Sequence, residues 1–466
     1  MIAIVESRAD RASRHICEQL RDRRDWEGRQ DESRPDADGG GTYYRFEEFE
    51  LRSFDALHLE LERPAEAFTE IPDLLVFASR HSGGTGPLLT AHCTGNFGPG
   101  EFGGSDHAVA DACPNALAQV LEAFDRHAPD GYDTGLECTH HGPTDVGCPS
   151  LFAELGSEEA QWADPDGACA VATSILELAG VDPHGPRQLV GFGGNHYVPR
   201  FERIVRDTPW TVGHVAADWA LESLGDPAAH RDLIDTAFTA SGATHAVIDG
   251  EWPGRDDLEA VIADLGYRVV SETWVREVGD RSLDLVEAVE TRLGDVDTGV
   301  RFGDVRGENF DVVDLPGDLV AAAEGVDPDG VWATLEGEAV AFETRNGGSR
   351  VGGRAALPMK DGDAGGTSPE MDDATANEAA RTILEAVCTI LTNRYDEVAV
   401  DEDVVVAREV AFDPALARAA GVPEGPAFGT LADGDAVTVD GEVIEPEEVC
   451  RERTRSFALD VPFTRE

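Results

Sequence analysis

Short apolar runs alternate with amphipathic segments along roughly the first 290 residues. Ile2–Val5 and Leu74–Phe77 are unbroken apolar runs, which are typical of buried strands. Residues 114–128 and 257–266 instead repeat their apolar positions every three to four residues, which predicts helices. The alternation predicts an α/β domain over residues 1–290, with a layered mixed sheet flanked by helices.

Two stretches depart from this pattern. The segment Arg23–Thr42 is polar and Gly-rich, and we expect a surface insertion there. After residue 290 the pattern changes, and residues 291–373 are expected to be a connecting region whose last part, 346–373, is a flexible Gly-rich linker. Residues 374–466 then predict one helix followed by a smaller β-rich C-terminal appendage.

The charge is strongly one-sided. The 466 residues include 37 basic and 92 acidic side chains, a formal net charge of −55, and Lys360 is the only lysine. Acidic residues are interspersed with regular apolar patterns, so the composition indicates a folded protein with a surface suited to molar salt rather than a disordered one. At about 1 M salt the screening length is roughly 3 Å and self-repulsion nearly vanishes. We therefore expect a halophilic protein.

The N-terminal sequence and the lengths of the apolar runs bear on where in the cell the protein is expected. The sequence begins MIAIVESRAD, whose apolar run is too short for a signal peptide, and no run approaches the length of a membrane span. We expect a cytoplasmic protein without membrane contact. Under strong screening its acidity does not exclude a nucleic-acid partner, but recognition would rest on shape, stacking and hydrogen bonds to a chain end.

Five of the 13 histidines lie in four Gly-containing loops, each directly after a predicted strand. Because ligand sites of α/β sheets gather at the carboxyl ends of strands, these histidines are candidates for one shared site. The alternative is that each is an ordinary polar loop residue. The histidines are His81, His92, His140, His141 and His196.

Imidazoles combined with a carboxylate form open zinc sites, and Glu137 and Glu154 lie close to these histidines in the sequence. Alternatively, Glu154 supports the helix expected to begin near Ser157. The sequence contains no H-E-x-x-H, G-x-S-x-G or G-x-x-x-x-G-K motif, which argues against a standard zinc protease, serine hydrolase or nucleotide triphosphatase.

The eight cysteines include no C-x-x-C pair, and we expect reduced thiols. Cys138 lies two residues before His140 and Cys93 follows His92, so a Cys–His nucleophile is an alternative to a metal site. Inert buried thiols are the favoured interpretation of both.

Six motifs over residues 1–290 resemble the archaeal and plant type of D-aminoacyl-tRNA deacylase: ASRHSGG, LTAHCTGNFG, THHGPT, FAELGSEEAQW, GFGGNHYVPRF and TVGHVAADWAL. The resemblance implies hydrolysis of the ester that joins a D-amino acid to the 3′ end of tRNA, zinc dependence, and a fold akin to phosphorylases and peptidyl-tRNA hydrolases. It carries over functional positions His81, His92, His140, His141, Glu154 and His196. One departure is Cys93-Thr94, where the family is expected to have Thr-Pro.

These observations give one working hypothesis for the site. One or two zinc ions are held by His140, His141, Glu154 and His196, and proton transfer is carried out by His81, His92 and Glu137. The substrate is contacted by Ser82, Gly83, Gly84, Asn96, Gly193 and Gly194. We expect a monomer that acts on aminoacylated tRNA and not on DNA. The alternatives are a metal-dependent hydrolase or amidase of small molecules, and a non-catalytic binder of the tRNA 3′ end.

The C-terminal tail carries a second resemblance. Phe412–Val449, with the pattern G-P-x-x-G-x-L at Gly425–Leu431, is similar to a segment of the tRNA 3′-processing endonuclease of the metallo-β-lactamase fold. That resemblance implies a role in tRNA docking, whereas a small structural β module is the alternative.

Overall fold

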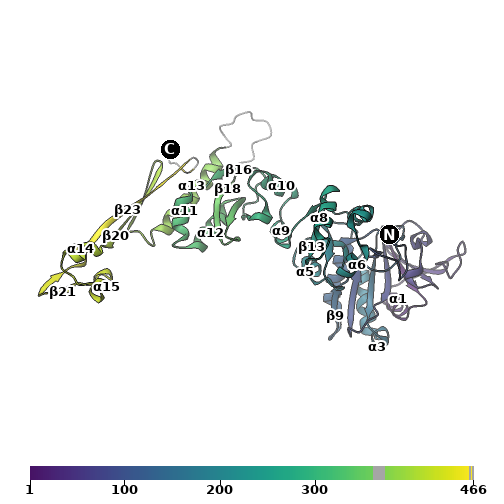
Figure 1. Cartoon of the computed structure of the whole chain (residues 1–466). Coiled ribbons are helices and arrows are strands. Elements are labelled where there is room, and N and C mark those ends of the chain that lie inside the picture. Colours follow the sequence, from purple (N-terminus) through teal and green to yellow (C-terminus); the bar gives the residue numbers. More distant parts are fainter. Residues whose placement is uncertain (360–372, 461–462, 464–466) are drawn as a thin grey trace. The chain divides into compact units, whose positions relative to one another are not determined.

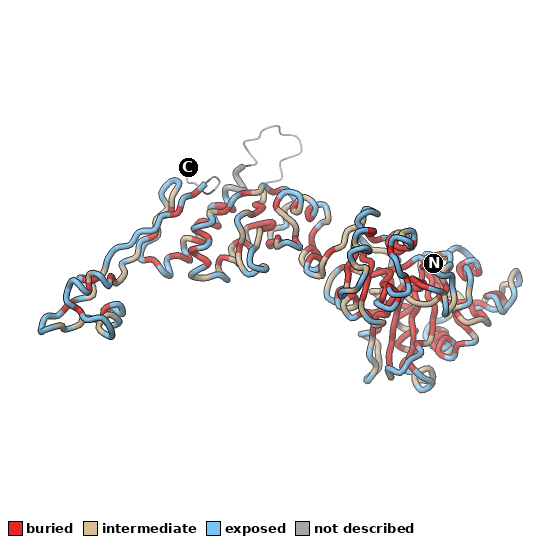
Figure 2. Tube along the Cα trace, viewed as in Figure 1, coloured by how far each residue is buried: buried red, intermediate tan, exposed pale blue. Residues whose placement is uncertain are grey.

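The computed structural model describes residues 1–359, 373–460 and 463, and the chain forms two compact units. The first unit comprises Met1–Gly279 and the second comprises Asp280–Glu466. Figure 1 shows their elements, and Figure 2 shows that buried residues concentrate in the strands of the first unit. Within the described ranges, no helix combines the length and apolar character that crossing a membrane requires.

The main sheet of the first unit has eight strands in a mixed arrangement. The parallel centre is β4–β1–β5–β10, and β6 runs antiparallel to β10 and parallel to β9. In order across the sheet, the strands are β2 (Glu27–Asp31), β3 (Gly41–Phe46), β4 (Phe49–Phe54), β1 (Ile2–Ser7), β5 (Leu74–Arg80), β10 (Ser150–Gly156), β6 (Leu88–His92) and β9 (Asp133–Leu136).

The two faces of this sheet are covered differently. Helices α1 (Arg11–Arg23), α2 (Pro114–His127) and α4 (Pro165–Leu176) pack on β5, β6 and β10 and against one another. Alternate strand residues such as Val5 and Phe77 pack instead with Phe68 and Val146, which lie in connecting segments. Covering on both faces explains why the central strands are unbroken apolar runs.

A second, all-parallel sheet of four strands follows in the order β12 (Thr211–Ala216), β11 (Gln188–Gly193), β13 (His245–Asp249), β14 (Arg268–Val269). It packs with helices and with a short pair, β7 (Gly95–Asn96) and β8 (Ala108–Val109), through a core that includes Phe97, Phe192 and Phe238. Its helices are α5 (Pro199–Asp207), α6 (Asp218–Leu224), α7 (Arg231–Ser241), α8 (Arg255–Asp264) and α9 (Glu272–Glu277).

The predicted α/β class with a mixed sheet flanked by helices is therefore confirmed, although the structure builds two sheets where the sequence suggested one. The kinship to phosphorylases and hydrolases stays a prediction. The expected surface insertion contains the hairpin β2–β3, which extends the main sheet. This polar segment is tied down because buried Arg52 donates to Asp31 at 2.6 Å and to Glu50 at 2.7 Å.

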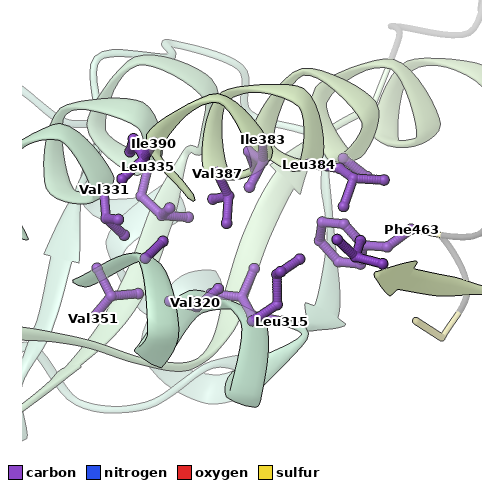
Figure 3. Packing of buried hydrophobic residues seen from close by; sticks show 14 of the residues in the cluster. Leu315, Val320, Val331, Leu335, Val351, Ile383, Leu384, Val387, Ile390 and Phe463 are labelled. Carbon is purple, nitrogen blue, oxygen red and sulfur yellow. The ribbon is translucent and has the colours of Figure 1, made fainter. Parts of the chain in front are cut away.

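The second unit contains an antiparallel sheet in the order β15 (Val300–Phe302), β17 (Ala341–Arg345), β18 (Arg350–Pro358), β16 (Phe310–Asp314). Helices α11 (Gly317–Glu324), α12 (Pro328–Glu338) and α13 (Asp373–Leu391) pack on it, and Figure 3 shows this core. Helix α10 (Leu283–Arg292) precedes the sheet.

The expected flexible linker is thus a strand as far as Pro358, because Val351, Ala355 and Leu357 are buried in this core. The remaining linker positions, 360–372, lie outside the described residues.

The tail of the second unit is a three-stranded antiparallel sheet, β19 (Glu397–Asp401), β20 (Val404–Phe412) and β23 (Cys450–Ala458). Between β20 and β23 lie α14 (Pro414–Ala419), α15 (Pro426–Ala432) and the hairpin β21 (Val437–Val439)–β22 (Glu442–Ile444), which share a small core of their own. Among the residues that the structure describes, the short 3-10 helices are His58–Glu60, Pro64–Ala67, Pro227–His230, Val296–Thr298 and Pro446–Val449.

Candidate functional site

The ends of strands from both sheets of the first unit meet at one place. His92 is the last residue of β6 and pairs with Phe152 of β10, while His81 directly follows β5. His140 and His141 follow β9, and His196 follows β11 of the second sheet. The Cys138 N–H donates to the His196 carbonyl at 2.9 Å and so joins the two sheets at this point. The structure therefore brings all five predicted histidines together.

Three imidazoles form a tight group. The ring centres of His92, His140 and His141 lie 4.2 to 4.9 Å apart. Each Nδ1 faces a backbone carbonyl: His92 that of Cys93 at 3.1 Å, His140 that of Cys138 at 2.8 Å and His141 that of Gly142 at 2.8 Å. Because a carbonyl can only accept, each Nδ1 carries the proton, and the Nε2 atoms of His140 and His141, whose pKa values are lowered, keep a lone pair. Burial lowers the pKa of His92, but the contact with Glu154 outweighs it and the pKa is raised.

His141 is held by an unusual backbone. Its φ is +49°, in the left-handed region that non-glycine residues rarely adopt. Gly142 follows, and a Cβ at Gly142 would lie 2.5 Å from the backbone of Gly103. The Gly142 N–H also donates to the Phe102 carbonyl at 3.1 Å, so two loops press together here. Such strain costs about 1–3 kcal/mol and is typical of functional sites.

Glu137 is a buried carboxylate surrounded by imidazoles. Its Oε1 lies 3.1 Å from His81 Nε2, and its Oε2 lies 3.5 Å from His196 Nε2 and 3.6 Å from His140 Nε2. Burial raises the pKa of Glu137, but the contacts with His196 and His81 outweigh it, and the pKa falls well below its ordinary value. Glu137 is therefore ionised in the interior.

Four further residues of the cluster have shifted pKa values. Burial lowers the pKa of His141 to about 3 and that of His140 well below its ordinary value, so both rings are neutral. The contact with Glu137 raises the pKa of His196. Glu154 Oε1 lies 3.8 Å from His92 Nε2, and burial raises the pKa of Glu154.

His81 belongs to a hydrogen-bond chain that the sequence did not reveal. Its Nδ1 lies 2.9 Å from Ser157 Oγ, which in turn lies 2.6 Å from Thr85 Oγ1. Its Nε2 lies 3.4 Å from the Tyr197 hydroxyl as well as facing Glu137. Ser157 is buried and does not line the neighbouring cavity, so it orients His81 and is not placed to attack a substrate.

A cavity of about 690 Å³ opens beside this cluster. Of the predicted site residues, those that line it are His81, Ser82, Asn96, His140, His141, Glu154 and His196. His92 and Glu137 lie behind this lining, at 0% and 1% exposure. Apolar side chains complete the wall, among them Leu57, Phe97 and Phe152.

Four predicted substrate-binding glycines are not part of the cavity lining. The Gly83 N–H donates to the Ser157 carbonyl at 3.2 Å and the Gly194 N–H to Asp218 Oδ1 at 2.9 Å, so neither amide is free for a substrate oxygen. Gly193, with φ +95°, lies where a Cβ would meet the Asp249 carbonyl. Gly84 has no atom within 4 Å of the position of a Cβ. Gly83, Gly193 and Gly194 therefore shape the loops that carry the histidines.

The thiols do not form a nucleophile here. Burial raises the pKa of Cys138 to about 12, although its Sγ lies 3.6 Å from His196 Nδ1. A thiol with this pKa stays protonated at neutral pH. Cys93 is buried at 2% exposure and does not line the cavity.

The residues fit a metal ion. Three sets of donor atoms lie within 4.8 Å of one another: His92, His140 and His141; Cys138, His140 and His196; and His92, Glu137 and Glu154. His92 Nε2 and both carboxylate oxygens of Glu137 are buried without a hydrogen-bond partner among the described residues, because their neighbours lie at ion-pair distance without hydrogen-bond alignment. Buried groups of this kind are costly unless a cation or a donor compensates them.

Comparison with known proteins places this site in a family. The family model described as D-aminoacyl-tRNA deacylase matches residues 68–270, which contain every residue of the cluster. A protein of Halorubrum lacusprofundi named D-aminoacyl-tRNA deacylase is 52% identical, over 99% of this chain and 97% of its own. The chain belongs to the D-aminoacyl-tRNA deacylase family. Membership makes the protein an ester-bond hydrolase, as the resemblance implied.

Other members show how far the likeness extends. The deacylase of Natronomonas pharaonis is 51% identical over 98% of this chain and 100% of its own, and that of Methanoregula boonei is 33% identical over 81% and 83%. A crystal structure of a conserved protein of unknown function matches with a TM-score of 0.53 and 27% identity, over 59% of this chain and 96% of its own.

Proposed function

We propose that the protein hydrolyses the ester between a D-amino acid and the 3′-terminal ribose of tRNA, and that it uses zinc. The observation that carries the proposal is the group of three imidazoles next to buried, ionised Glu137, at the wall of a cavity of about 690 Å³. The family supports tRNA deacylation, and the donor atoms support a metal.

We assign the metal to His92, His140 and His141. Their Nδ1 protons are committed to backbone carbonyls, so the Nε2 atoms are the ones left to bind a metal, which at His92 would replace the proton that Glu154 favours. Three neutral imidazoles with an open position are a common catalytic zinc set, in which zinc acts as a Lewis acid on water and on a carbonyl. Glu154 supports His92 from 3.8 Å.

Proton transfer is assigned to Glu137 and His196. Glu137 is an ionised carboxylate that lies 3.1 to 3.6 Å from His81, His140 and His196, and it accepts the proton of the attacking water. His196 faces Glu137 at 3.5 Å and is the most exposed of the histidines that approach it, so it delivers a proton to the leaving ribose oxygen. His81 is fixed by Ser157 and holds Glu137 in place.

This assignment differs from the working hypothesis at four residues. Glu154 supports His92 instead of binding the metal, and His81 positions Glu137 instead of carrying a proton. His92 joins the metal ligands because its ring is grouped with His140 and His141 and is shielded from the cavity. His196 moves to proton transfer because its Nε2 lies 3.5 Å from Glu137, although it also lies near His140.

Discrimination against the L-ester follows from the shape of the cavity. The imidazoles hold the ester, and apolar residues such as Leu57 and Phe97 form another part of the cavity lining. When the ester and the ribose are both fixed, the two enantiomers send their side chains in opposite directions, and the wall excludes one of them.

The decisive experiment compares D-tyrosyl-tRNA and L-tyrosyl-tRNA in molar salt with zinc present. We expect release of D-tyrosine and an intact L-ester. Equal cleavage of both would contradict the chiral proposal. Comparable turnover of a free D-tyrosine ethyl ester would identify a small-molecule hydrolase instead, and tRNA binding without turnover would identify a binder.

A further inference from the structure

Two aromatic rings stand exposed at the same cavity. Phe102 is 68% exposed and Trp219 is 47% exposed, and both line the cavity beside the histidines. Among the described residues, the other exposed large hydrophobic side chains are aliphatic: Ile71, Val410 and Val443. Exposed aromatic rings are costly in water, and a pair of them at a cavity indicates a ligand with a flat surface.

The backbone of Phe102 is fixed against the histidine cluster. Its carbonyl accepts the Gly142 N–H at 3.1 Å, directly after His141. The Asn96 amide donates to the carbonyls of Gly103 at 2.8 Å and of Ser105 at 3.1 Å. Phe102 therefore keeps a set position relative to the proposed metal ligands. Asn96 contributes by holding this loop, in addition to lining the cavity.

Trp219 is fixed from the second sheet. It lies in the first turn of α6, directly after Asp218, whose carboxylate accepts the Gly194 N–H at 2.9 Å. Gly194 lies two residues before His196. The two rings are thus anchored against the two loops that carry His141 and His196. Phe102 lies in the loop between β7 and β8, and Trp219 lies in α6.

A cation lines the same cavity without a side-chain ion pair among the described residues, although Asp10, Glu101 and Glu154 also line it and Asp10 accepts the Arg80 backbone N–H at 3.1 Å. Arg80 lines the cavity and forms no ion pair with any residue that the structure describes, although the chain has 92 acidic side chains. Its guanidinium lies 5.3 Å from the centre of the Trp162 ring. An aminoacyl ester offers a positively charged amine, which an arginine repels. The group of an aminoacylated tRNA that an arginine attracts is a phosphate.

We propose that this region binds the 3′-terminal adenosine nucleotide of tRNA, with Phe102 and Trp219 stacking on the adenine and Arg80 pairing with its phosphate. The inference rests on the proposed function, because the ester of the substrate is attached to the ribose of this same nucleotide. A cavity of about 690 Å³ lies within the range that holds a ligand of nucleoside size.

The phosphate contact and the stacking contacts depend differently on salt, which matters for a strongly acidic protein. A phosphate contact weakens as salt rises, because the counterions released on binding gain less entropy. Stacking on an aromatic ring is not screened in this way and tolerates molar salt. The aromatic pair should therefore contribute more to tRNA affinity than Arg80 does under halophilic conditions.

The test measures binding of uncharged, 5′-labelled tRNA to the full-length protein in molar salt by fluorescence anisotropy. One tRNA has the complete CCA end and the other lacks the terminal adenosine. We expect the wild type to bind the complete tRNA about tenfold more tightly. Phe102→Ala and Trp219→Ala should each lose most of this preference, and Trp219→Phe should keep it. Arg80→Gln should weaken binding of the complete tRNA and flatten its salt dependence.

The matched control is Ile71→Ala, which removes an exposed apolar side chain, 80% exposed, that does not line the cavity. It should bind both tRNAs as the wild type does. The inference is wrong if the wild type binds both tRNAs equally, or if the two alanine variants keep the full preference. Because the probe carries no ester, failure of deacylation with a retained preference would contradict only the proposed function. Deacylation without a preference would contradict only this inference.

Discussion

At the scale of single residues, the site depends on tautomers that the backbone sets. His92, His140 and His141 each give their Nδ1 proton to a carbonyl no more than two residues away. The direction of each ring is therefore encoded locally, whereas the grouping of the rings depends on the fold. Replacing one of these rings should remove a metal ligand without unfolding the rest.

His141→Ala should abolish tight zinc binding and lower kcat by at least about 100-fold, since even the partners of metal ligands contribute about 10–100-fold. Zinc content by mass spectrometry after dialysis gives a readout that is independent of activity. His107→Ala is the control, because His107 stacks on His230 away from the cluster. Full zinc content in the His141 variant would contradict the ligand assignment.

Glu137→Gln should separate binding from catalysis. The amide has nearly the same shape but cannot take a proton, so we expect kcat to fall by about 10²–10⁴-fold with zinc still bound. Steady-state kinetics together with zinc content measures both effects. Glu122→Gln, on the exposed face of α2, should leave both unchanged. A variant that keeps normal kcat would show that Glu137 is not the base.

At the scale of elements, His214 ties β12 to its surroundings. Its Nε2 donates to the Ala110 carbonyl at 2.8 Å, and its Nδ1 lies 3.1 Å from Thr139 Oγ1. Burial lowers the pKa of His214 to about 4. The ring is thus neutral in the folded state, and it joins the second sheet to the loop that carries the histidines.

The pKa of His214 makes stability depend on pH. Below its unfolded pKa of about 6.5, the unfolded chain binds a proton that the folded chain rejects until about pH 4. Stability from this group is therefore complete above about pH 6.5 and is lost as pH falls toward 4, by about 3 kcal/mol. Denaturant unfolding of wild type and His214→Gln over this range should show a shallower slope for the variant. Parallel slopes would contradict the assignment.

The sequence predicted individual strands and helices better than it predicted which distant residues contact one another. Unbroken apolar runs such as Leu74–Phe77 identified buried strands, and strand-exit histidines identified the cluster, because both signals are local. The contact of Glu137 with His81 and the chain from His81 to Ser157 link residues 56 and 76 positions apart, and no local pattern encodes them. The strand Arg350–Pro358 was missed because its glycines and arginines mask the alternate burial of Val351, Ala355 and Leu357.

At the scale of the whole molecule, a net charge of −55 governs stability. Lowering salt from about 1 M to about 0.1 M lengthens the screening distance from roughly 3 Å to 10 Å, so acidic groups over a wide area repel one another. We expect Tm to fall steadily over this range when it is followed by circular dichroism. Replacing the salt with sucrose, which does not screen charge, should not restore Tm. Full restoration by sucrose would contradict the electrostatic origin.

The hydrogen bond from Cys138 to the His196 carbonyl joins the two sheets of the first unit, which contribute different residues to the proposed site. The proposed zinc ligands lie at the end of a strand of the eight-stranded sheet or after one, whereas His196 and Trp219 follow strands of the four-stranded sheet. Loosening of the smaller sheet alone would therefore keep the proposed zinc ligands in place but displace the proposed proton donor, His196, and Trp219 of the proposed adenine site. Heat inactivation should then precede metal release, and cooling should restore turnover without any added zinc.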